Sequence, residues 1–271
     1  MTPMMEQYFQ VKEQYKDYLL FYRLGDFYEM FFDDAILASR ELELTLTGRD
    51  CGEPERAPMC GVPFHSSEGY IGRLIEKGYK VAICEQTEDP AQAKGLVKRE
   101  VVRVITPGTL IETNLLSEQK NNYLCALYMG EFEYGVCFAD ISTAQVYATT
   151  FDGNNRDARL RNELGTYAPR EVLCNLKRAN MGEVGAFIAS QKNTMLTDGQ
   201  GARFDPAVCR ELVKAQFGDQ LRAETLEEKA MVTAVGAVLS YLIDTEKTDL
   251  SSFQIRLQKV NDLDSCEEDL L

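Results

Sequence analysis

The stretch that decides the fold of the first part of the chain is LLFYRLGDFYEMFFDDA, residues 19–35. Residues 18–24 alternate in the manner of a β-strand, and residues 29–44 carry apolar side chains at helical spacing. The pattern therefore predicts that a strand turns into a helix at Gly25-Asp26. Aromatic residues beside a carboxylate at such a turn are suited to contact flat ligands, and nucleic-acid bases are flat ligands.

Two explanations for the residues after this turn remain open. In the first, Asp26 caps the helix, Glu29 completes a capping box three residues later, and Phe27 packs as a hydrophobic staple. In the second, an aromatic ring stays exposed at the tip of the helix. The run of aromatic residues covers more than one helical face, so its rings cannot all enter one core.

Composition limits the class of protein. The chain has 271 residues, 45% of them hydrophobic, which is enough for a buried core and suggests two domains. The N-terminus lacks the features of a signal peptide, and the longest apolar run, residues 231–243, is too short to span a bilayer. Eight cysteines without a CxxC pair, and a single histidine at His65, provide no zinc-ligand set and favour a reducing, cytoplasmic location.

The net charge of −14 argues against a general nucleic-acid binder, because nonspecific affinity for phosphates comes from lysine and arginine. The segment AKGLVKREVVRV, residues 93–104, is a local exception with four basic residues against one glutamate. DNA binding by this chain would therefore depend on local geometry that overcomes the overall field.

The order of predicted elements gives two α/β domains, at residues 1–113 and 114–250, with residues 251–271 as the start of a linker. The predicted elements are a helix at 4–18, the strand and helix described above, a Gly/Pro/Cys-rich loop at 48–66, a helix at 67–77, strands at 79–86 and 97–108, three strands joined by tight turns at 122–151, mixed helices and short strands after these, and an apolar helix at 228–245.

Four motifs in the first domain resemble the bacterial MutS family of DNA mismatch-repair proteins. The first is FYRLGDFYEMFFDDA, which contains the Phe-x-Glu hallmark of the family. APMCGVPFHS, VAICEQTEDP and VKREVVRVITPGT follow in the family's order and spacing, and the four motifs cover most of residues 16–110. The second domain, with FADISTAQ at 138–145, is more loosely similar to the family's connector domain. The resemblance implies a mixed-sheet α/β mismatch-reading domain followed by an RNase H-like α/β connector domain.

The same resemblance implies a role for two residues. Phe27 would stack on a mispaired or unpaired base from the minor groove and kink the duplex, and Glu29 would contact the base edge beside the ring. Glu29 would discriminate partly by the penalty that a carboxylate meets near phosphates, and a protonated Glu29 could donate a hydrogen bond to a base. Contacts to the DNA backbone are expected from five residues, which are His65, Gln86, Lys98, Arg99 and Arg49.

The chain contains no G-x-x-x-x-G-K-[ST] motif, so no P-loop is present to hold ATP phosphates. The sequence is therefore expected to be an N-terminal fragment that is not itself an enzyme and holds no cofactor. The resemblance implies that ATP, Mg²⁺ and homodimerisation belong to the full-length protein, and that a downstream repair protein such as MutL is a partner. No membrane partner is expected.

Two alternatives of other classes come from the second domain. Asp140, followed by Ser142, resembles the first hairpin of RNase H-like nucleases, which hold metal ions on several carboxylates. Catalysis would need further acids, for which Glu171, Asp198 and Asp244 are the candidates, whereas the simpler interpretation is that Asp140 closes a tight turn. The other alternative is a protein-interaction module without DNA contact.

Overall fold

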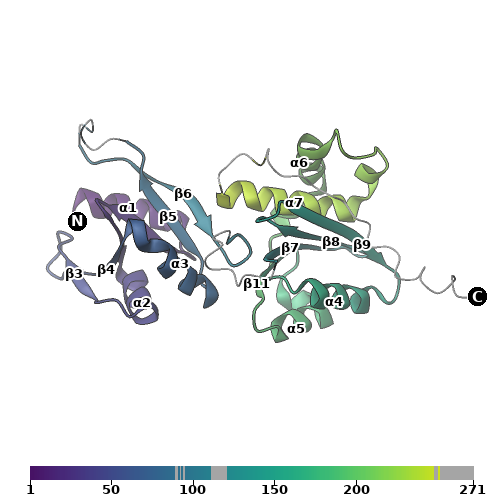
Figure 1. Ribbon diagram of the computed structural model, residues 1–271, viewed down its shortest axis with the longest axis horizontal. Coiled ribbons are helices and arrows are strands. Elements are labelled where there is room, and N and C mark those ends of the chain that lie inside the picture. Colours follow the sequence, from purple (N-terminus) through teal and green to yellow (C-terminus); the bar gives the residue numbers. More distant parts are fainter. Residues whose placement is uncertain (89–90, 92, 94, 111–120, 247–249, 251–271) are drawn as a thin grey trace, which may run out of the picture. The chain divides into compact units, whose positions relative to one another are not determined.

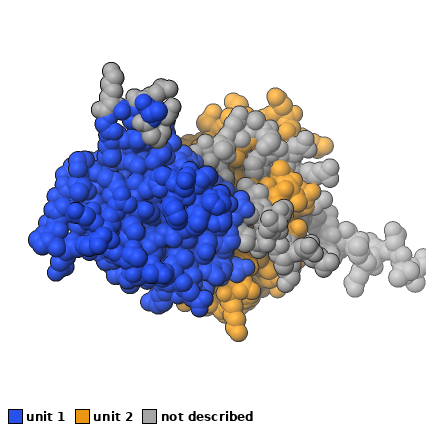
Figure 2. Space-filling model, turned by 60° about the vertical axis from the view of Figure 1, so that its left-hand side comes forward, with its two compact units in different colours: residues 1–117, 245–247 blue, residues 118–244, 248–271 orange. Residues whose placement is uncertain are grey.

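The computed structural model describes residues 1–88, 91, 93, 95–110, 121–246 and 250. The chain divides into two compact units, the first formed by Met1–Ser117 with Thr245–Lys247 and the second by Glu118–Asp244 with Thr248–Leu271 (Figure 2). The predicted boundary at residue 113 and the predicted linker at 251–271 lie outside the described residues.

The first unit is built on a six-stranded mixed sheet with the strand order β3-β4-β2-β1-β5-β6 (Figure 1). All neighbouring strands are antiparallel except β1 and β5, which are parallel. The strands are β1 (Leu19–Leu24), β2 (Phe27–Phe31), β3 (Thr47–Arg49), β4 (Ala57–Pro63), β5 (Val81–Gln86) and β6 (Arg99–Ile105). The helices are α1 (Pro3–Gln14), α2 (Phe32–Leu42) and α3 (Ser67–Glu76), and a short 3-10 helix, η1 (Phe64–Ser66), precedes α3.

Side-chain alternation along the strands gives this sheet a core on each face. Tyr28 and Met30 of β2 pack into one cluster with apolar residues of α2 and α3. Phe31 of the same strand and Tyr22 of β1 pack into a second cluster with residues of α1, including Tyr8. The sheet is therefore covered by α2 and α3 on one face and by α1 on the other.

The structure corrects the prediction for the opening motif. The chain forms a β-hairpin of β1 and β2 at Gly25-Asp26, and α2 begins only at Phe32. Phe32 has a left-handed φ of +53°, which lets the chain leave β2 and enter the helix at once. The predicted helix at 29–44 is confirmed over Phe32–Leu42, but its predicted start was wrong, because residues 29–31 belong to β2 and FYEMFF satisfies both helical and strand spacing.

The predicted loop at 48–66 was also partly wrong, because it contains β4 and the end of β3. Ala57, Cys60 and Val62 of β4 are buried, and the strand pairs with β2 over Met59–Pro63. Its two prolines stand at places that a strand tolerates. Pro58 lies second in the strand and Pro63 at its end.

The second unit contains a five-stranded mixed sheet with the order β11-β10-β7-β8-β9. Three antiparallel strands, β7 (Tyr123–Met129), β8 (Glu133–Asp140) and β9 (Gln145–Asp152), confirm the predicted run of strands. Two parallel strands follow, β10 (Glu171–Cys174) and β11 (Met195–Thr197). The helices are α4 (Arg156–Tyr167), α5 (Gly182–Ser190), α6 (Pro206–Phe217) and α7 (Lys229–Glu246), with 3-10 turns at Arg178–Asn180, Gly201–Phe204 and Thr225–Glu227.

Helices cover both faces of this second sheet. Figure 1 shows α6 and α7 on one side and α4 and α5 on the other, and two separate buried clusters correspond to these sides. A Cβ atom at Gly135 of β8 would lie 1.9 Å from the carbonyl oxygen of Ala230, so only glycine lets α7 lie directly on the sheet. The predicted α/β class with two domains and mixed sheets is confirmed. Among the described residues, none of the helices combines the length and the apolar character that crossing a membrane requires.

Candidate nucleic-acid interface

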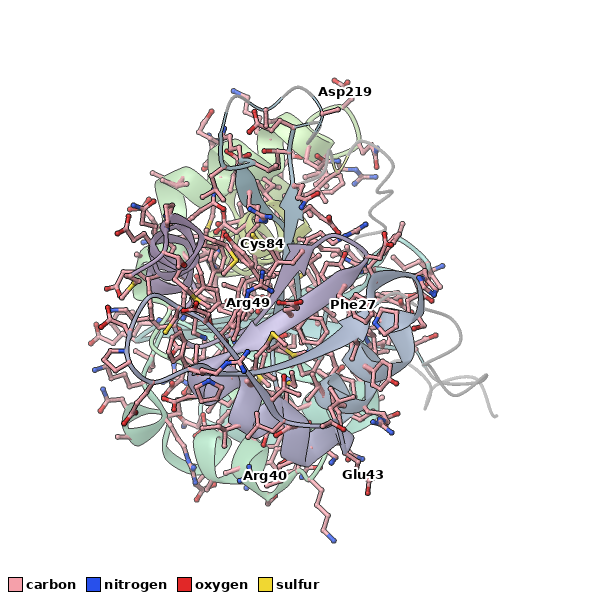
Figure 3. All side chains as sticks on the ribbon, turned by 90° about the vertical axis from the view of Figure 1, so that its left-hand side faces the viewer. Phe27, Arg40, Glu43, Arg49, Cys84 and Asp219 are labelled. Atoms are coloured by element: carbon pink, nitrogen blue, oxygen red, sulfur yellow. The ribbon has the colours of Figure 1, made fainter. Side chains whose placement is uncertain are left out.

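The site begins at the two-residue turn between β1 and β2. Leu24 pairs with Phe27 across the hairpin, so Gly25 and Asp26 alone connect the strands. Gly25 has a φ of +59°, a conformation that glycine adopts without the steric cost of a side chain. Phe27 is therefore the first residue of β2, directly after an exposed turn (Figure 3).

Strand alternation places Phe27, Glu29 and Phe31 on one face of β2, and their environments differ. Phe31 is fully buried in the cluster with α1, whereas 46% of Phe27 is exposed and the side chain of Glu29 is 15% exposed. The capping-box explanation is wrong, because no helix begins at this turn. Asp26 lies in the turn of the hairpin, and Glu29 lies on its second strand, β2. An exposed aromatic ring and a carboxylate thus stand two residues apart on one strand face.

Glu29 forms an ion pair with Arg49 of β3, in which Nη1 of Arg49 lies 2.7 Å from Oε2 of Glu29. Gly61 of β4 pairs with Glu29, and a Cβ atom at Gly61 would lie 3.4 Å from Cγ of Glu29 and 3.2 Å from the carbonyl oxygen of Tyr28. Glycine at this position therefore leaves room for the carboxylate side chain. Arg49 was predicted to contact the DNA backbone, and in the structure it pairs with Glu29, which was predicted to contact the base edge.

Burial raises the pKa of Glu29 above its ordinary value, and the nearby charge and hydrogen bond of Arg49 oppose this rise without cancelling it. The carboxyl group consequently takes up a proton more readily than a solvated glutamate does. A protonated carboxyl group has one hydrogen to donate, whereas the ionised form only accepts. Protonation of Glu29 would therefore change what this side chain offers to a ligand.

Three other predicted contact residues lie at or near the surface of the first unit. His65 is exposed in η1, with its ring edge-on to Phe64. Gln86 ends β5 and is half-buried. Lys98 is exposed, and its Nζ lies 2.7 Å from a carboxylate oxygen of Glu100.

Arg99 occupies a different environment from these three residues. It is 7% exposed, and its donors reach the carbonyl oxygens of Arg23 and Val97 and the side-chain oxygen of Gln7 at 2.8–3.1 Å. Its guanidinium group also lies over the ring of Tyr22, 5.1 Å from the centroid. This placement favours a structural role for Arg99, in which it ties the ends of β1 and β6 to α1.

The sequence interpretation missed two residues beside the turn. The guanidinium carbon of Arg23 lies 3.5 Å from the ring centroid of Phe64, and Arg23 also pairs with Glu85. Arg23 precedes the turn and Phe64 follows β4. Because the two residues are far apart along the chain, the local sequence pattern gives little indication of their contact.

The four carboxylates considered for a metal site, which are Asp140, Glu171, Asp198 and Asp244, do not form a metal-binding group. Oδ1 of Asp140 accepts hydrogen bonds from the backbone N–H and the hydroxyl group of Ser142, as a turn-closing aspartate does. Glu171 accepts from Thr197 and Tyr241, while Asp198 and Asp244 bond to residues elsewhere. Within the described part of the chain, no three Asp, Glu, His or Cys residues are grouped so that they could hold a metal ion.

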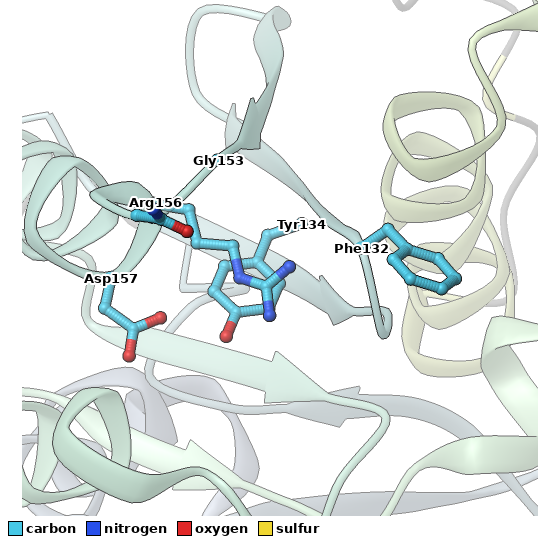
Figure 4. A pocket seen from close by; sticks show the side chains of 6 residues that line it. Phe132, Tyr134, Gly153, Arg156 and Asp157 are labelled. Atoms are coloured by element: carbon cyan, nitrogen blue, oxygen red, sulfur yellow. The ribbon is translucent and has the colours of Figure 1, made fainter.

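The second unit has an open hollow of about 510 Å³ at the turn between β7 and β8 (Figure 4). Phe132 stands on this turn and is 78% exposed. The guanidinium group of Arg156 lies over the ring of Tyr134, 4.5 Å from its centroid. The hollow was not predicted from the sequence. The residues that line it are Phe132, Tyr134, Gly153, Asn154, Arg156 and Asp157.

Two family descriptions match the chain, MutS domain I over residues 2–114 and MutS domain II over residues 122–254. The chain is also similar to proteins named DNA mismatch repair protein MutS. It is 50% identical over 253 residues to that of Ruminiclostridium cellulolyticum, 49% over 255 residues to that of Desulforamulus reducens, and 46% over 257 residues to that of Acetivibrio thermocellus. These matches cover 93–94% of this chain but only 29% of each relative. The chain belongs to the MutS family and carries the family's domains I and II.

Proposed function

We propose that the first unit recognises mispaired or unpaired bases in duplex DNA and thereby serves DNA mismatch repair. The observation that carries the proposal is the exposed ring of Phe27 on the hairpin turn of a MutS domain I, beside the carboxylate of Glu29. The names of the relatives support this role, because each is called a DNA mismatch repair protein. The relatives are longer, so the proposal concerns the part that this chain spans.

Phe27 acts as a wedge in this proposal. A mispaired base costs less free energy to unstack than a paired one. An apolar ring inserted from the minor groove is therefore expected to insert most favourably at the mispair. Stacking of a base on an aromatic side chain contributes about 1–3 kcal/mol and tolerates any base. The ring of Phe27 has no hydrogen-bonding group that must be satisfied, and the strand behind it holds its backbone.

Glu29 supplies discrimination beside the ring. The ionised carboxylate is repelled by phosphates, so approach to well-paired DNA carries a penalty that a kinked, mispaired site relieves. The raised pKa of Glu29 makes the protonated form accessible, and that form donates a hydrogen bond to a base acceptor. Arg49 limits how far the pKa of Glu29 rises and holds the side chain in place.

Residues around the turn contact the sugar-phosphate backbone and set the register of the wedge without reading sequence. His65, Gln86 and Lys98 are proposed for these contacts because they are exposed or half-exposed in the first unit. Arg99 supports them indirectly, since its donors are bonded inside the fold. Because the net charge of −14 opposes the approach of DNA, this binding depends on these local contacts.

The second unit is proposed to act as the connector of the longer protein, in accord with its match to MutS domain II. We propose that this chain acts by binding and not by catalysis. ATP and Mg²⁺ use, homodimerisation and contact with a downstream repair protein such as MutL belong to the proposal for the longer protein.

The proposal is tested by titrating two otherwise identical duplexes at low salt, one fully matched and one with a single G·T pair or an unpaired T. Wild type is expected to prefer the flawed duplex, and Phe27→Ala to lose that preference. A Glu29→Gln variant is expected to bind matched DNA more tightly, because the carboxylate penalty is gone. Equal binding of both duplexes by the wild type, unchanged in Phe27→Ala, would contradict the wedge.

A further inference from the structure

Both carbonyl groups of the Gly25-Asp26 turn, which precedes Phe27, accept hydrogen bonds from residues that are not part of the turn. The carbonyl oxygen of Gly25 accepts a hydrogen bond from Nε of Arg23 at 2.5 Å. The carbonyl oxygen of Asp26 accepts one from the backbone N–H of Phe64 at 2.9 Å. An exposed two-residue turn is thereby bonded on both sides, although Gly25 and Asp26 themselves are open to solvent.

The side chain of Arg23 is itself fixed by three further contacts. Its guanidinium group stacks on Phe64 at 3.5 Å from the ring centroid, and Nη1 lies 3.4 Å from each carboxylate oxygen of Glu85. Glu85 also accepts a hydrogen bond from the hydroxyl group of Tyr28, the residue that follows Phe27. The side chains of Arg23 and Glu85 are only 17% and 27% exposed.

This combination of contacts needs an arginine. The planar guanidinium group can stack on a ring with its face while its edge donates in two directions, to Gly25 and to Glu85. A lysine keeps the charge but has one ammonium group, which cannot serve the ring, the carbonyl and the carboxylate together. The paired carboxylate of Glu85 also neutralises Arg23, so its role is inside the protein more than at a phosphate.

We propose that Arg23 is a positioning residue that, with Phe64 and Glu85, fixes the Gly25-Asp26 turn and so holds the ring of Phe27 in one outward orientation. The consequence for DNA rests on the function proposed above. A ring that is already ordered loses less conformational entropy when it inserts between bases than a ring on a mobile turn. Arg23 therefore contributes to mismatch preference without touching the base.

The positioning itself can be tested without DNA, because the chain contains no tryptophan. A Phe27→Trp variant places one indole at the turn, and its fluorescence anisotropy and acrylamide quenching report how mobile that position is. Adding Arg23→Lys is expected to lower the anisotropy and speed the quenching. Adding Arg40→Lys, which changes an exposed arginine of α2 that pairs with Glu41, is the matched control and is expected to change neither.

A second pair of variants tests whether Arg23 must stack on an aromatic ring at position 64, or whether an apolar side chain there is enough. Phe64→Tyr keeps the ring and is expected to retain wild-type mobility at position 27, whereas Phe64→Leu removes the stack and is expected to behave as Arg23→Lys does. Thermal unfolding followed by circular dichroism shows whether each variant is folded, and a variant that fails to fold is replaced by Glu85→Gln. Unchanged anisotropy in folded Arg23→Lys and Phe64→Leu would overturn the proposal.

The DNA arm separates this inference from the proposed function. With Phe27 unchanged, Arg23→Lys is expected to reduce the preference for a G·T duplex by about threefold to tenfold, which is the range expected from the entropy cost of ordering one side chain on binding. A mobile indole with an unchanged mismatch preference would keep the positioning role and refute its link to recognition. Absence of any preference in the wild type would refute the proposed function and leave the mobility result standing.

Discussion

Two β-hairpins of this molecule expose a phenylalanine at the turn, and their surroundings differ. Phe27 follows the turn of β1 and β2 and is 46% exposed, while Phe132 lies in the turn of β7 and β8 and is 78% exposed. The turn of Phe132 is closed by its own strands, with the N–H of Gly130 bonded to the carbonyl of Glu133 at 3.0 Å. The turn of Phe27 is also bonded by Arg23 and by the backbone of Phe64.

The difference teaches that exposure of an aromatic ring is a poor guide to a binding site. By exposure alone, Phe132 is the stronger candidate. Phe27 has a carboxylate two residues along the same strand face, where Phe132 has Tyr134, and the turn before Phe27 is also bonded by the backbone N–H of Phe64, which lies outside the hairpin. An isolated exposed ring is common on protein surfaces, whereas an exposed ring beside a carboxyl group of raised pKa is a candidate for a site.

The largest effect is expected from removing the two rings in turn. Phe27→Ala should weaken binding to a mismatched duplex by about 1–3 kcal/mol, the contribution of one base–aromatic stack. Phe132→Ala removes an equally apolar and more exposed ring and should leave mismatch binding unchanged. Titration of G·T and matched duplexes with both variants measures this contrast directly. Equal losses in the two variants would show that the comparison of the hairpins has no functional meaning.

The two turns also use glycine for different reasons, and this predicts different responses to substitution. Gly25 has a left-handed φ, and a Cβ atom added there would have nothing within 4 Å, whereas a Cβ atom at Gly130 would lie 2.8 Å from the carbonyl oxygen of Glu133. Gly25→Ala should lower the free energy of unfolding by about 1–2 kcal/mol through backbone strain. Gly130→Ala should have a cost of similar size, about 1–3 kcal/mol, through crowding.

Asparagine separates these two causes. It tolerates the left-handed region better than alanine does, so Gly25→Asn should cost less than Gly25→Ala. At Gly130 the obstacle is space, so Gly130→Asn should be no better than Gly130→Ala. Urea unfolding of the four variants measures the order, and a reversed order at either turn would contradict its assignment.

The hairpin of the second unit could be predicted from the sequence, and that of the first could not. Residues 122–151 consist of short runs rich in apolar residues that are separated by polar turn residues, as is typical of buried strands joined by tight turns. In the first unit, Phe27, Met30 and Phe31 satisfy helical spacing, although the segment can equally alternate as a strand. The pairing of β2 with β4, from a segment that resembles a loop, decides between the two, and such pairing is invisible to local pattern.

The candidate site shows the same division. Phe27 and Glu29 were singled out through the resemblance to the MutS family, while the local pattern placed them at the start of a helix. The structure puts both on one face of β2, because two residues along a strand return to the same face. The basic segment around Lys98 and Arg99 offered no sign that one side chain is exposed and the other buried. The contact between Arg23 and Phe64 joins residues 41 positions apart, and only the folded sheet brings them together.

A smaller effect is expected from the ion pair of Glu29 and Arg49, which sharpens the contrast with the turn of Phe132. The side chains are 15% and 39% exposed, so solvent screens part of the attraction. A double-mutant cycle with Glu29→Gln and Arg49→Gln should give a coupling free energy of about 0.2–1 kcal/mol in urea unfolding. In DNA titrations, Arg49→Gln should alter the discrimination between duplexes, because it frees Glu29. A coupling of zero would show that Arg49 does not hold the carboxylate.

The smallest and most specific effect is expected from pH. Burial raises the pKa of Glu29, so its neutral form stabilises the fold, and this contribution is complete below the pKa in the unfolded chain and is lost as pH rises through the raised pKa. Burial also raises the pKa of Asp34, so the comparison must be made against Glu29→Gln, which keeps Asp34 unchanged.

Binding should follow the same direction as stability, since the neutral carboxyl group donates to a base and is not repelled by phosphate. The affinity of the wild type for a G·T duplex should therefore fall as pH is raised through the range in which Glu29 ionises. Glu29→Gln should show a flatter profile over that range, and Phe132→Ala should retain the wild-type profile. Parallel profiles for wild type and Glu29→Gln would place the titrating group elsewhere, and the hairpin of Phe27 would then differ from that of Phe132 by the bonding of its turn and not by its carboxyl group.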